Sequence, residues 1–158
     1  MKITFTKKSV KAINKWLKRN GFNTTCAFVK GDELAYDADD DLILIPKHYN
    51  SEPDSLFVKC LRNLGLASDF DAVTLSILHE LGHAQTFPLF TLNEWNAFDV
   101  KKLQMSIAGD PEEDSFYTDY WEIKDELAAN TWATMYANLF ENKVQKLENI
   151  IEENVKFG

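Results

Sequence analysis

The stretch His79-Glu80-Leu81-Gly82-His83 decides how the rest of this chain is interpreted. It lies within residues 70–86, where apolar side chains recur at helical intervals, so the sequence predicts a helix there. Residues four apart lie on the same face of a helix, and both imidazoles can therefore bind one zinc ion. Glu80 lies between them and is placed to activate a water molecule bound to that ion.

The residues around this motif predict a buried helix. Ser68 and Asp71 have the spacing of a capping box, which marks the start of a helix. Gly82 is unfavourable inside a helix, so its presence predicts that another element packs closely against it. The stripe that we expect to face the core comprises Phe70, Val73, Ile77, Leu78 and Leu81. In the alternative interpretation, His79 and His83 are half-buried residues that hydrogen-bond to their neighbours and bind no metal.

A catalytic zinc ion usually has three protein ligands and one water molecule. No histidine follows His83, and the upstream His48 lies in a predicted strand-exit loop, so we expect a carboxylate as the third ligand. Glu126 has the most suitable setting, because it lies on a predicted helix whose small residues allow close packing. Asn130, one turn further along, is placed to orient a ligand histidine through a hydrogen bond. Glu122, one turn before Glu126, is the alternative ligand.

The motif helix and the segment Glu126-Leu127-Ala128-Ala129-Asn130-Thr131-Trp132-Ala133 together resemble the gluzincin metallopeptidases. Within that group, the chain is most similar to the ImmA/IrrE-type cytoplasmic peptidases, whose strands before the motif helix resemble residues 34–46. The resemblance implies a zincin-like fold, a zinc cofactor and, as substrate, one or a few particular intracellular proteins. The chain departs from the family in its longer segment between His83 and Glu126 and in the residues after Ala133. The helix-turn-helix region that some members carry is absent here.

The apolar periodicity and the turn residues predict an α+β fold. We expect a small, mostly antiparallel sheet packed on several helices, including the motif helix and the helix that carries Glu126. Predicted strands lie at residues 2–6, 24–30 and 33–46. Predicted helices lie at residues 9–20, 54–64, 70–86 and 93–106, followed by a mobile acidic loop over residues 107–120. The chain then ends in one long helix or in two, at residues 119–141 and 143–156.

The composition indicates a single domain over residues 1–158. Hydrophobic residues make up 45% of the chain, which is enough for a packed core. The longest aliphatic stretch, residues 42–46, is far too short to cross a membrane. The first residues lack the apolar core of a signal peptide, so we expect a cytoplasmic protein. Cys26 and Cys60 have no paired spacing, which predicts free thiols rather than a disulfide or metal ligands.

The charge pattern limits the partners that we expect. A net charge of −8 argues against nucleic acid, because binding phosphates requires a basic surface. Eight carboxylates and the single cation Lys124 occupy residues 110–126. We interpret this stretch as a solvated loop leading into a helix, the alternative being a surface that repels acidic partners or attracts a basic one. The sequence gives no indication of the oligomeric state.

These residues predict a zinc-dependent endopeptidase, and the resemblance implies that it hydrolyses peptide bonds of a specific intracellular protein. His79, His83 and Glu126 would bind Zn²⁺, while Glu80 would take a proton from the bound water and pass it to the leaving amine. The substrate backbone could add as a strand to an exposed edge, for which residues 42–45 are the candidate.

An electrophilic donor to the developing oxyanion is also expected. Tyr117, Tyr120 and Tyr136 are the candidates, and the sequence does not choose between them. The predicted loop over residues 107–120, with Gly109 as its hinge, could cover the cleft.

The main alternative is a catalytically weak or inactive zincin-fold protein that acts by binding a partner protein. Small acidic chains of this kind can be encoded by phages or mobile elements. Metal-dependent hydrolysis of a non-peptide substrate is a third hypothesis. The variant Glu80→Gln separates the first two, because it removes the proton acceptor and leaves the metal ligands in place.

Overall fold

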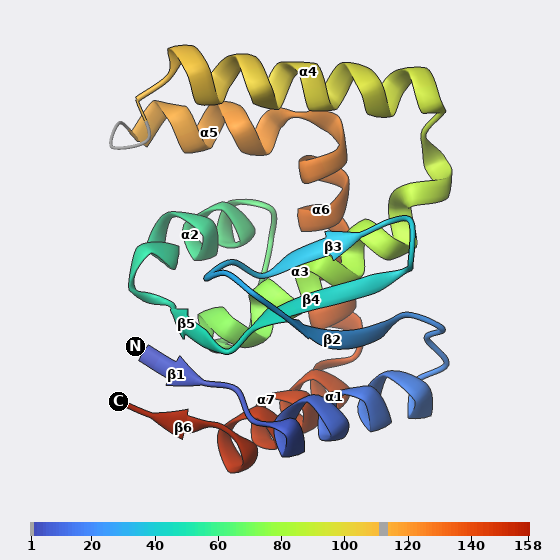
Figure 1. The fold of residues 1–158 in the computed structure, drawn as a ribbon, viewed down its shortest axis with the longest axis vertical. Coiled ribbons are helices and arrows are strands. Elements are labelled where there is room, and N and C mark those ends of the chain that lie inside the picture. The colour runs from blue at the N-terminus through green and yellow to red at the C-terminus, as the bar shows by residue number, and fades with distance from the viewer. Residues whose placement is uncertain (1, 111–113) are drawn as a thin grey trace.

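The computed structural model describes residues 2–110 and 114–158, and the side chains of residues 53, 114, 115, 117 and 118 are outside this description. The described residues form an α+β fold (Figure 1). The helices are α1 (Lys7–Arg19), α2 (Ser55–Asn63), α3 (Ala72–Thr86), α4 (Leu92–Ala108), α5 (Asp114–Glu122), α6 (Lys124–Leu139) and α7 (Glu141–Asn154), with 3-10 turns η1 (Glu52–Asp54) and η2 (Phe87–Leu89). The strands are β1 (Lys2–Thr4), β2 (Thr25–Val29), β3 (Ala35–Asp37), β4 (Leu42–Pro46), β5 (His48–Asn50) and β6 (Lys156–Phe157).

The strands form two three-stranded sheets, so the prediction of one small sheet is wrong. In the first sheet, β1 lies between β5 and β6 and runs antiparallel to both, which joins the two ends of the chain (Figure 1). In the second sheet, β4 lies between β2 and β3. The chain passes from β2 to the far edge at β3 and returns between them. As a result β4 is antiparallel to β3 and parallel to β2.

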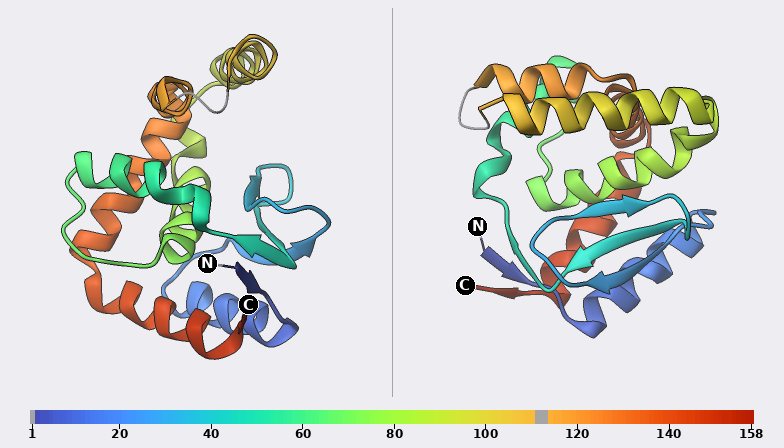
Figure 2. Two further views of the ribbon diagram at one scale, coloured as in Figure 1. Left: turned by 90° about the vertical axis from the view of Figure 1, so that its left-hand side faces the viewer. Right: turned by 45° about the horizontal axis from the view of Figure 1, so that its top comes forward.

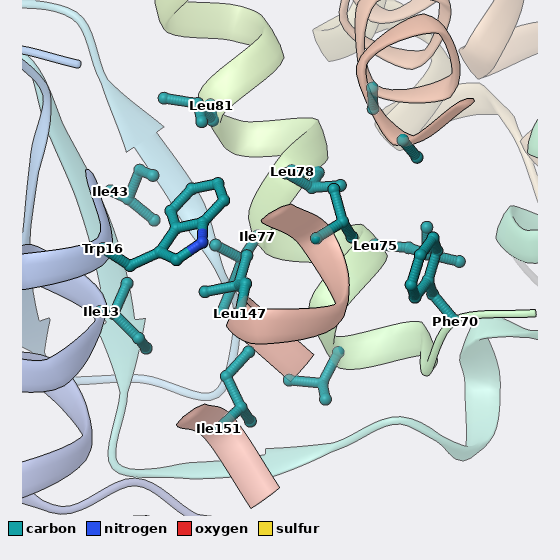
Figure 3. Packing of buried hydrophobic residues seen from close by; sticks show 14 of the residues in the cluster. Ile13, Trp16, Ile43, Phe70, Leu75, Ile77, Leu78, Leu81, Leu147 and Ile151 are labelled. Atoms are coloured by element: carbon teal, nitrogen blue, oxygen red, sulfur yellow. The ribbon is translucent and has the colours of Figure 1, made fainter. Parts of the chain in front are cut away.

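Helix α3 lies at the centre of the hydrophobic core (Figure 3). Its predicted apolar stripe is confirmed, because all five residues are buried and Ile77, Leu78 and Leu81 have no exposed surface. Figure 3 shows side chains of α1, β4 and α7 gathered around this helix: Ile13, Trp16, Ile43, Leu147 and Ile151. Burial of this many large apolar side chains, at about 1.5–3 kcal/mol each, fixes α3 in the fold.

The close packing predicted at Gly82 is confirmed, and the element that packs there is α6. A Cβ atom built on Gly82 would lie 2.5 Å from the carbonyl oxygen of Ala129. Ala129 and Ala133 are completely buried on α6. Small residues on both helices therefore let the two backbones approach closely, and this contact sets the position of every polar group that α6 directs toward α3.

The start of α3 differs from the prediction. The helix begins at Ala72, and the N-cap Asp71 makes no capping hydrogen bond with its side chain, so the predicted capping box is wrong. The backbone N–H of Asp71 instead donates to the carboxylate of Glu148 on α7, at 2.9 Å. A tertiary contact thus anchors the helix start in place of a local one.

Helices α4 and α5 lie side by side at one end of the molecule (Figure 1 and Figure 2). The prediction of a mobile loop over residues 107–120 is therefore wrong for the part that α5 occupies, and residues 111–113 lie outside the described residues. Gly109 ends α4, and a Cβ there would lie 2.5 Å from the ring of Phe116. Its role is therefore to allow close packing of α5 on α4, rather than to act as a hinge.

The C-terminal part of the chain contains separate helices rather than one long one. Ile123 has an extended conformation, with φ −60° and ψ 133°, and this separates α5 from α6. Phe140 separates α6 from α7. No described helix combines the length and the apolar character needed to span a bilayer. Both cysteines are free thiols, as predicted, with Cys26 buried and Cys60 half-buried.

Candidate metal centre

Two helices bring the candidate metal ligands together. His79, Glu80 and His83 lie on α3, and Glu126 lies in the first turn of α6. All four side chains are buried, and Glu126 exposes only 4% of its surface. Polar groups are rarely buried to this extent without a partner, so their grouping at one helix contact needs a chemical explanation.

One carboxylate oxygen of Glu126 lies against both imidazoles. Oε2 of Glu126 lies 2.9 Å from Nε2 of His79 and 3.1 Å from Nε2 of His83. A tetrahedral zinc ion with ligands at about 2.0–2.1 Å places its donor atoms about 3.3 Å apart. The two separations from Glu126 are slightly shorter than that value, and imidazole nitrogen and carboxylate oxygen are among the donors that zinc accepts. The residues therefore fit a divalent metal ion such as zinc.

Asn130, one turn after Glu126, contacts the far side of His79. Its Oδ1 accepts a hydrogen bond from Nδ1 of His79 at 2.6 Å. With a proton held on Nδ1, Nε2 is the nitrogen that faces Glu126: it donates to that carboxylate when protonated, and a metal ion would replace this proton. The Asn130 amide also donates to Sγ of Cys60 at 3.7 Å, which fixes its orientation. The contact that the sequence predicted for Asn130 is therefore present.

Burial and neighbouring charges alter the acidity of these groups. Burial alone would lower the pKa of His79, but the hydrogen bond and charge of Glu126 outweigh it and raise that pKa to about 9. Burial alone would raise the pKa of Glu126, but hydrogen bonds from His79 and His83 hold it well below its ordinary value. The cluster thus favours positive charge at Nε2, and a proton and a metal ion would compete for that place.

Glu80 lies beside the cluster, with its Oε1 atom 3.9 Å from Nε2 of His79. Burial raises the pKa of its carboxyl group, and the nearby His79 and His83 partly oppose this effect. A carboxylate with a raised pKa is suited to accept a proton and release it again near neutral pH. Glu80 also lines the cleft described below, so it faces the space that a substrate would enter.

Sequence reasoning missed Lys102, which reaches the cluster from α4. Its Nζ atom lies 2.9 Å from Oε1 of Glu126 and 2.5 Å from Oδ2 of Asp125. Burial alone would lower the pKa of Lys102, but these two carboxylates outweigh it and the pKa is raised. A signal was present in the sequence, because residue 102 shares a helical face with Trp95, Phe98 and Met105. A single lysine within an apolar stripe indicates a buried acidic partner.

The candidate cluster opens into a cleft of about 1290 Å³. Strand β3 and the loop before it form one wall, and α4 and α5 contribute another. The sequence placed the exposed edge at residues 42–45, which is wrong, because β4 is the central strand of its sheet. The strand of that sheet that lines the cleft is instead β3, an edge strand.

The three tyrosines proposed as oxyanion donors lie in different places. Tyr120 lines the cleft and donates from its hydroxyl to Oε1 of Glu126 at 2.9 Å. Tyr136 is wrong as a candidate, because it packs in the core against Trp16 and Trp132. Tyr117 is on α5, and its side chain lies outside the described residues.

Neither alternative ligand belongs to the cluster. Glu122 ends α5 and is exposed, because the extended Ile123 separates it from the helix of Glu126. His48 lies on β5 and pairs with the hydroxyl of Thr4 at 3.2 Å. Among the described residues, the buried groups that bring potential metal ligands together are His79, Glu80 and His83, and His83, Asp125 and Glu126. Comparison with known proteins finds no matching family model, curated protein or solved structure, so inferences about this centre depend on its geometry and its sequence motifs.

Proposed function

We propose that this protein is a zinc-dependent endopeptidase of the gluzincin type, related to the ImmA/IrrE-like peptidases, with a specific intracellular protein as substrate. The observation that supports this most strongly is the contact of one Glu126 oxygen with Nε2 of both His79 and His83, beside the buried carboxylate of Glu80. A cation site alone would not require Glu80 there. Its position at the open cleft supports chemistry on a bound molecule.

In this proposal each residue of the cluster has a defined task. His79, His83 and Glu126 would hold the ion, and Asn130 keeps the Nδ1 proton on His79. A bound zinc ion would supply Lewis acidity, lowering the pKa of a water molecule to about 7 and polarising a carbonyl group. Glu80 would accept a proton from the attacking water and deliver it to the leaving amine. Tyr120, the remaining sequence-derived candidate for an oxyanion donor, lines the cleft, but its hydroxyl would have to leave Oε1 of Glu126 to donate to an oxyanion.

Strand β3 suggests how a peptide would be held. It is an edge strand of three residues, Ala35–Asp37, and it lines the same cleft as Glu80. An extended peptide can pair with such an edge through main-chain hydrogen bonds, which orient it without regard to its sequence. Specificity would then come from the side chains of the cleft walls.

The proposal is tested by asking whether the protein hydrolyses peptides and whether this hydrolysis depends on Glu80. Zinc-loaded protein is incubated with a library of peptides from digested cell extract, and new N-termini are identified by mass spectrometry. We expect a restricted set of new termini with the wild type and none with Glu80→Gln, which retains the metal ligands. Absence of new termini with the wild type, or the same termini with Glu80→Gln, would contradict the proposal.

A second candidate function, binding of a partner protein without catalysis, is favoured by one observation. The outer side of α4 exposes several large apolar side chains: Leu92, Val100, Leu103 and Ile107, each with at least 54% of its surface accessible. Exposed apolar groups gathered on one helix are typical of contact surfaces. If Glu80→Gln retains the full biological effect of the protein, this second function is the correct one.

A further inference from the structure

We propose that Lys102 is a positioning residue which, together with Tyr120, makes Glu126 present a single carboxylate oxygen to the metal. This inference rests on the proposed function, because it concerns the third ligand of the same centre. It goes beyond the ligand set, since Lys102 comes from α4, outside the two helices that carry the motif residues.

The two oxygens of Glu126 have separate partners. Oε2 faces the imidazoles of His79 and His83, at 2.9 Å and 3.1 Å. Oε1 accepts hydrogen bonds from Nζ of Lys102 and from the hydroxyl of Tyr120, both at 2.9 Å. To turn both oxygens toward the histidines, the carboxylate would have to break these two bonds. Each is a half-buried bond to a charged group, the stronger class of hydrogen bond.

This arrangement has a consequence for the coordination of the ion. A carboxylate that binds through one oxygen leaves a tetrahedral zinc ion one position for water, as catalytic zinc sites require. A carboxylate that binds through both oxygens would fill that position or raise the coordination number. Lys102 and Tyr120 therefore keep the centre open for a substrate or a water molecule.

The charge of Lys102 is balanced by Asp125. The carboxylate of Asp125 is 99% buried, and its Oδ2 atom accepts from Lys102 at 2.5 Å. Without this partner, a lysine near a cation site would weaken metal binding by Coulomb repulsion. With it, the pair adds little net charge, and the hydrogen bond to Glu126 is the main effect on the centre. The two explanations therefore predict opposite changes in zinc affinity when Lys102 is removed: loss of positioning weakens binding, whereas loss of Coulomb repulsion strengthens it.

The test compares Lys102→Met, Tyr120→Phe and the charge-balanced double variant Lys102→Met with Asp125→Asn. The dissociation constant for zinc is measured by competition with a chromogenic chelator, and the coordination is followed in the visible spectrum of the cobalt(II)-substituted protein. Thermal unfolding of the metal-free proteins controls for folding, and Lys102→Arg tests rescue, because arginine keeps the charge and the donors.

We expect zinc binding to weaken about tenfold or more in the double variant and in Lys102→Met, the usual range for loss of a group that orients a metal ligand. Tyr120→Phe should show a smaller loss without any change in charge. In all three, the intense cobalt bands of a four-coordinate site should give way to the weaker bands of a higher coordination number. Lys102→Arg should restore the wild-type spectrum.

Unchanged or tighter zinc binding in Lys102→Met and in the double variant, with an unchanged cobalt spectrum, would overturn the inference. If the wild type binds zinc and these variants behave as expected but no peptide is cleaved, the peptidase proposal fails and the role of Lys102 stands. If the wild type binds neither zinc nor cobalt, both are overturned.

Discussion

Substitution of Gly82 by alanine tests how the contact between α3 and α6 builds the candidate centre. The new Cβ would lie 2.5 Å from the carbonyl oxygen of Ala129 and 3.0 Å from its Cα atom. Both are backbone atoms, so no side chain can rotate away to make room. Ordinary contact begins near 3.4 Å, and the two helices must therefore separate locally by about 0.9 Å.

Two effects of opposite sign decide the stability of Gly82→Ala. Alanine favours the helix by about 1 kcal/mol relative to glycine. Overpacking of a tight contact costs about 1–3 kcal/mol. We expect a net loss of about 1 kcal/mol in the free energy of unfolding, or about 2–4 °C in melting temperature for a chain of this size. The larger effect is on the candidate centre. Glu126 and Asn130 lie on the same helix as Ala129, within one turn of it, and move away from His79 with it.

Gly82→Ala should therefore weaken zinc binding at least tenfold while the protein remains folded. Zinc affinity is measured by chelator competition, and stability by urea unfolding of the metal-free protein. Gln85→Ala, at an exposed position of the same helix, is the matched control and should change neither quantity. If Gly82→Ala is more stable than the wild type and binds zinc equally well, α3 and α6 do not pack as described and the reasoning is refuted.

Three further predictions concern the pH dependence, the thiols and the core. In metal-free protein, the pKa of His79 is about 9 against 6.5 in the unfolded chain, so its stabilising contribution is complete below pH 6.5 and disappears as the pH rises through 9. Urea unfolding should show this loss, and His79→Gln should flatten the curve over that window. Burial raises the pKa of Cys26 to about 12, so in a Cys60→Ser background a thiol reagent at pH 8 should label the unfolded protein and not the native one. Leu147→Ala should lower the free energy of unfolding by about 2–5 kcal/mol, because the side chain of Leu147 is completely buried. Leu139 is 71% exposed, so Leu139→Ala should change the free energy of unfolding by no more than about 0.5 kcal/mol.

Local sequence patterns were sufficient to predict α3 and its role in the core. The apolar stripe and Gly82 are two separate signals, and both indicate that other elements surround α3. That Glu126 and Asn130 share one face also followed from local spacing, because residues four apart share a helical face, and the small residues around them predicted close packing on another helix. The chemical role of these residues remains a prediction.

Features that depend on long-range topology were not predictable in this way. The periodicity of residues 42–45 indicates a strand, but its position between β2 and β3 depends on the path of the chain through both neighbours. The contact of Lys102 with Glu126 joins residues on α4 and α6 that no spacing rule connects. Tyr136 looked equivalent to Tyr120 in the sequence, and only the tertiary packing places it in the core against Trp16 and Trp132.

The measurement that tests the central claim most directly is the zinc content of three proteins purified in parallel: the wild type, Glu126→Ala and Glu122→Ala. Glu122 is exposed and lies outside the cluster, so its variant is matched in charge and differs only in position. We predict about one zinc ion per chain in the wild type and in Glu122→Ala, and loss of zinc in Glu126→Ala. Absence of zinc from the wild type even after zinc is added, or retention of zinc in Glu126→Ala, would contradict the proposed centre.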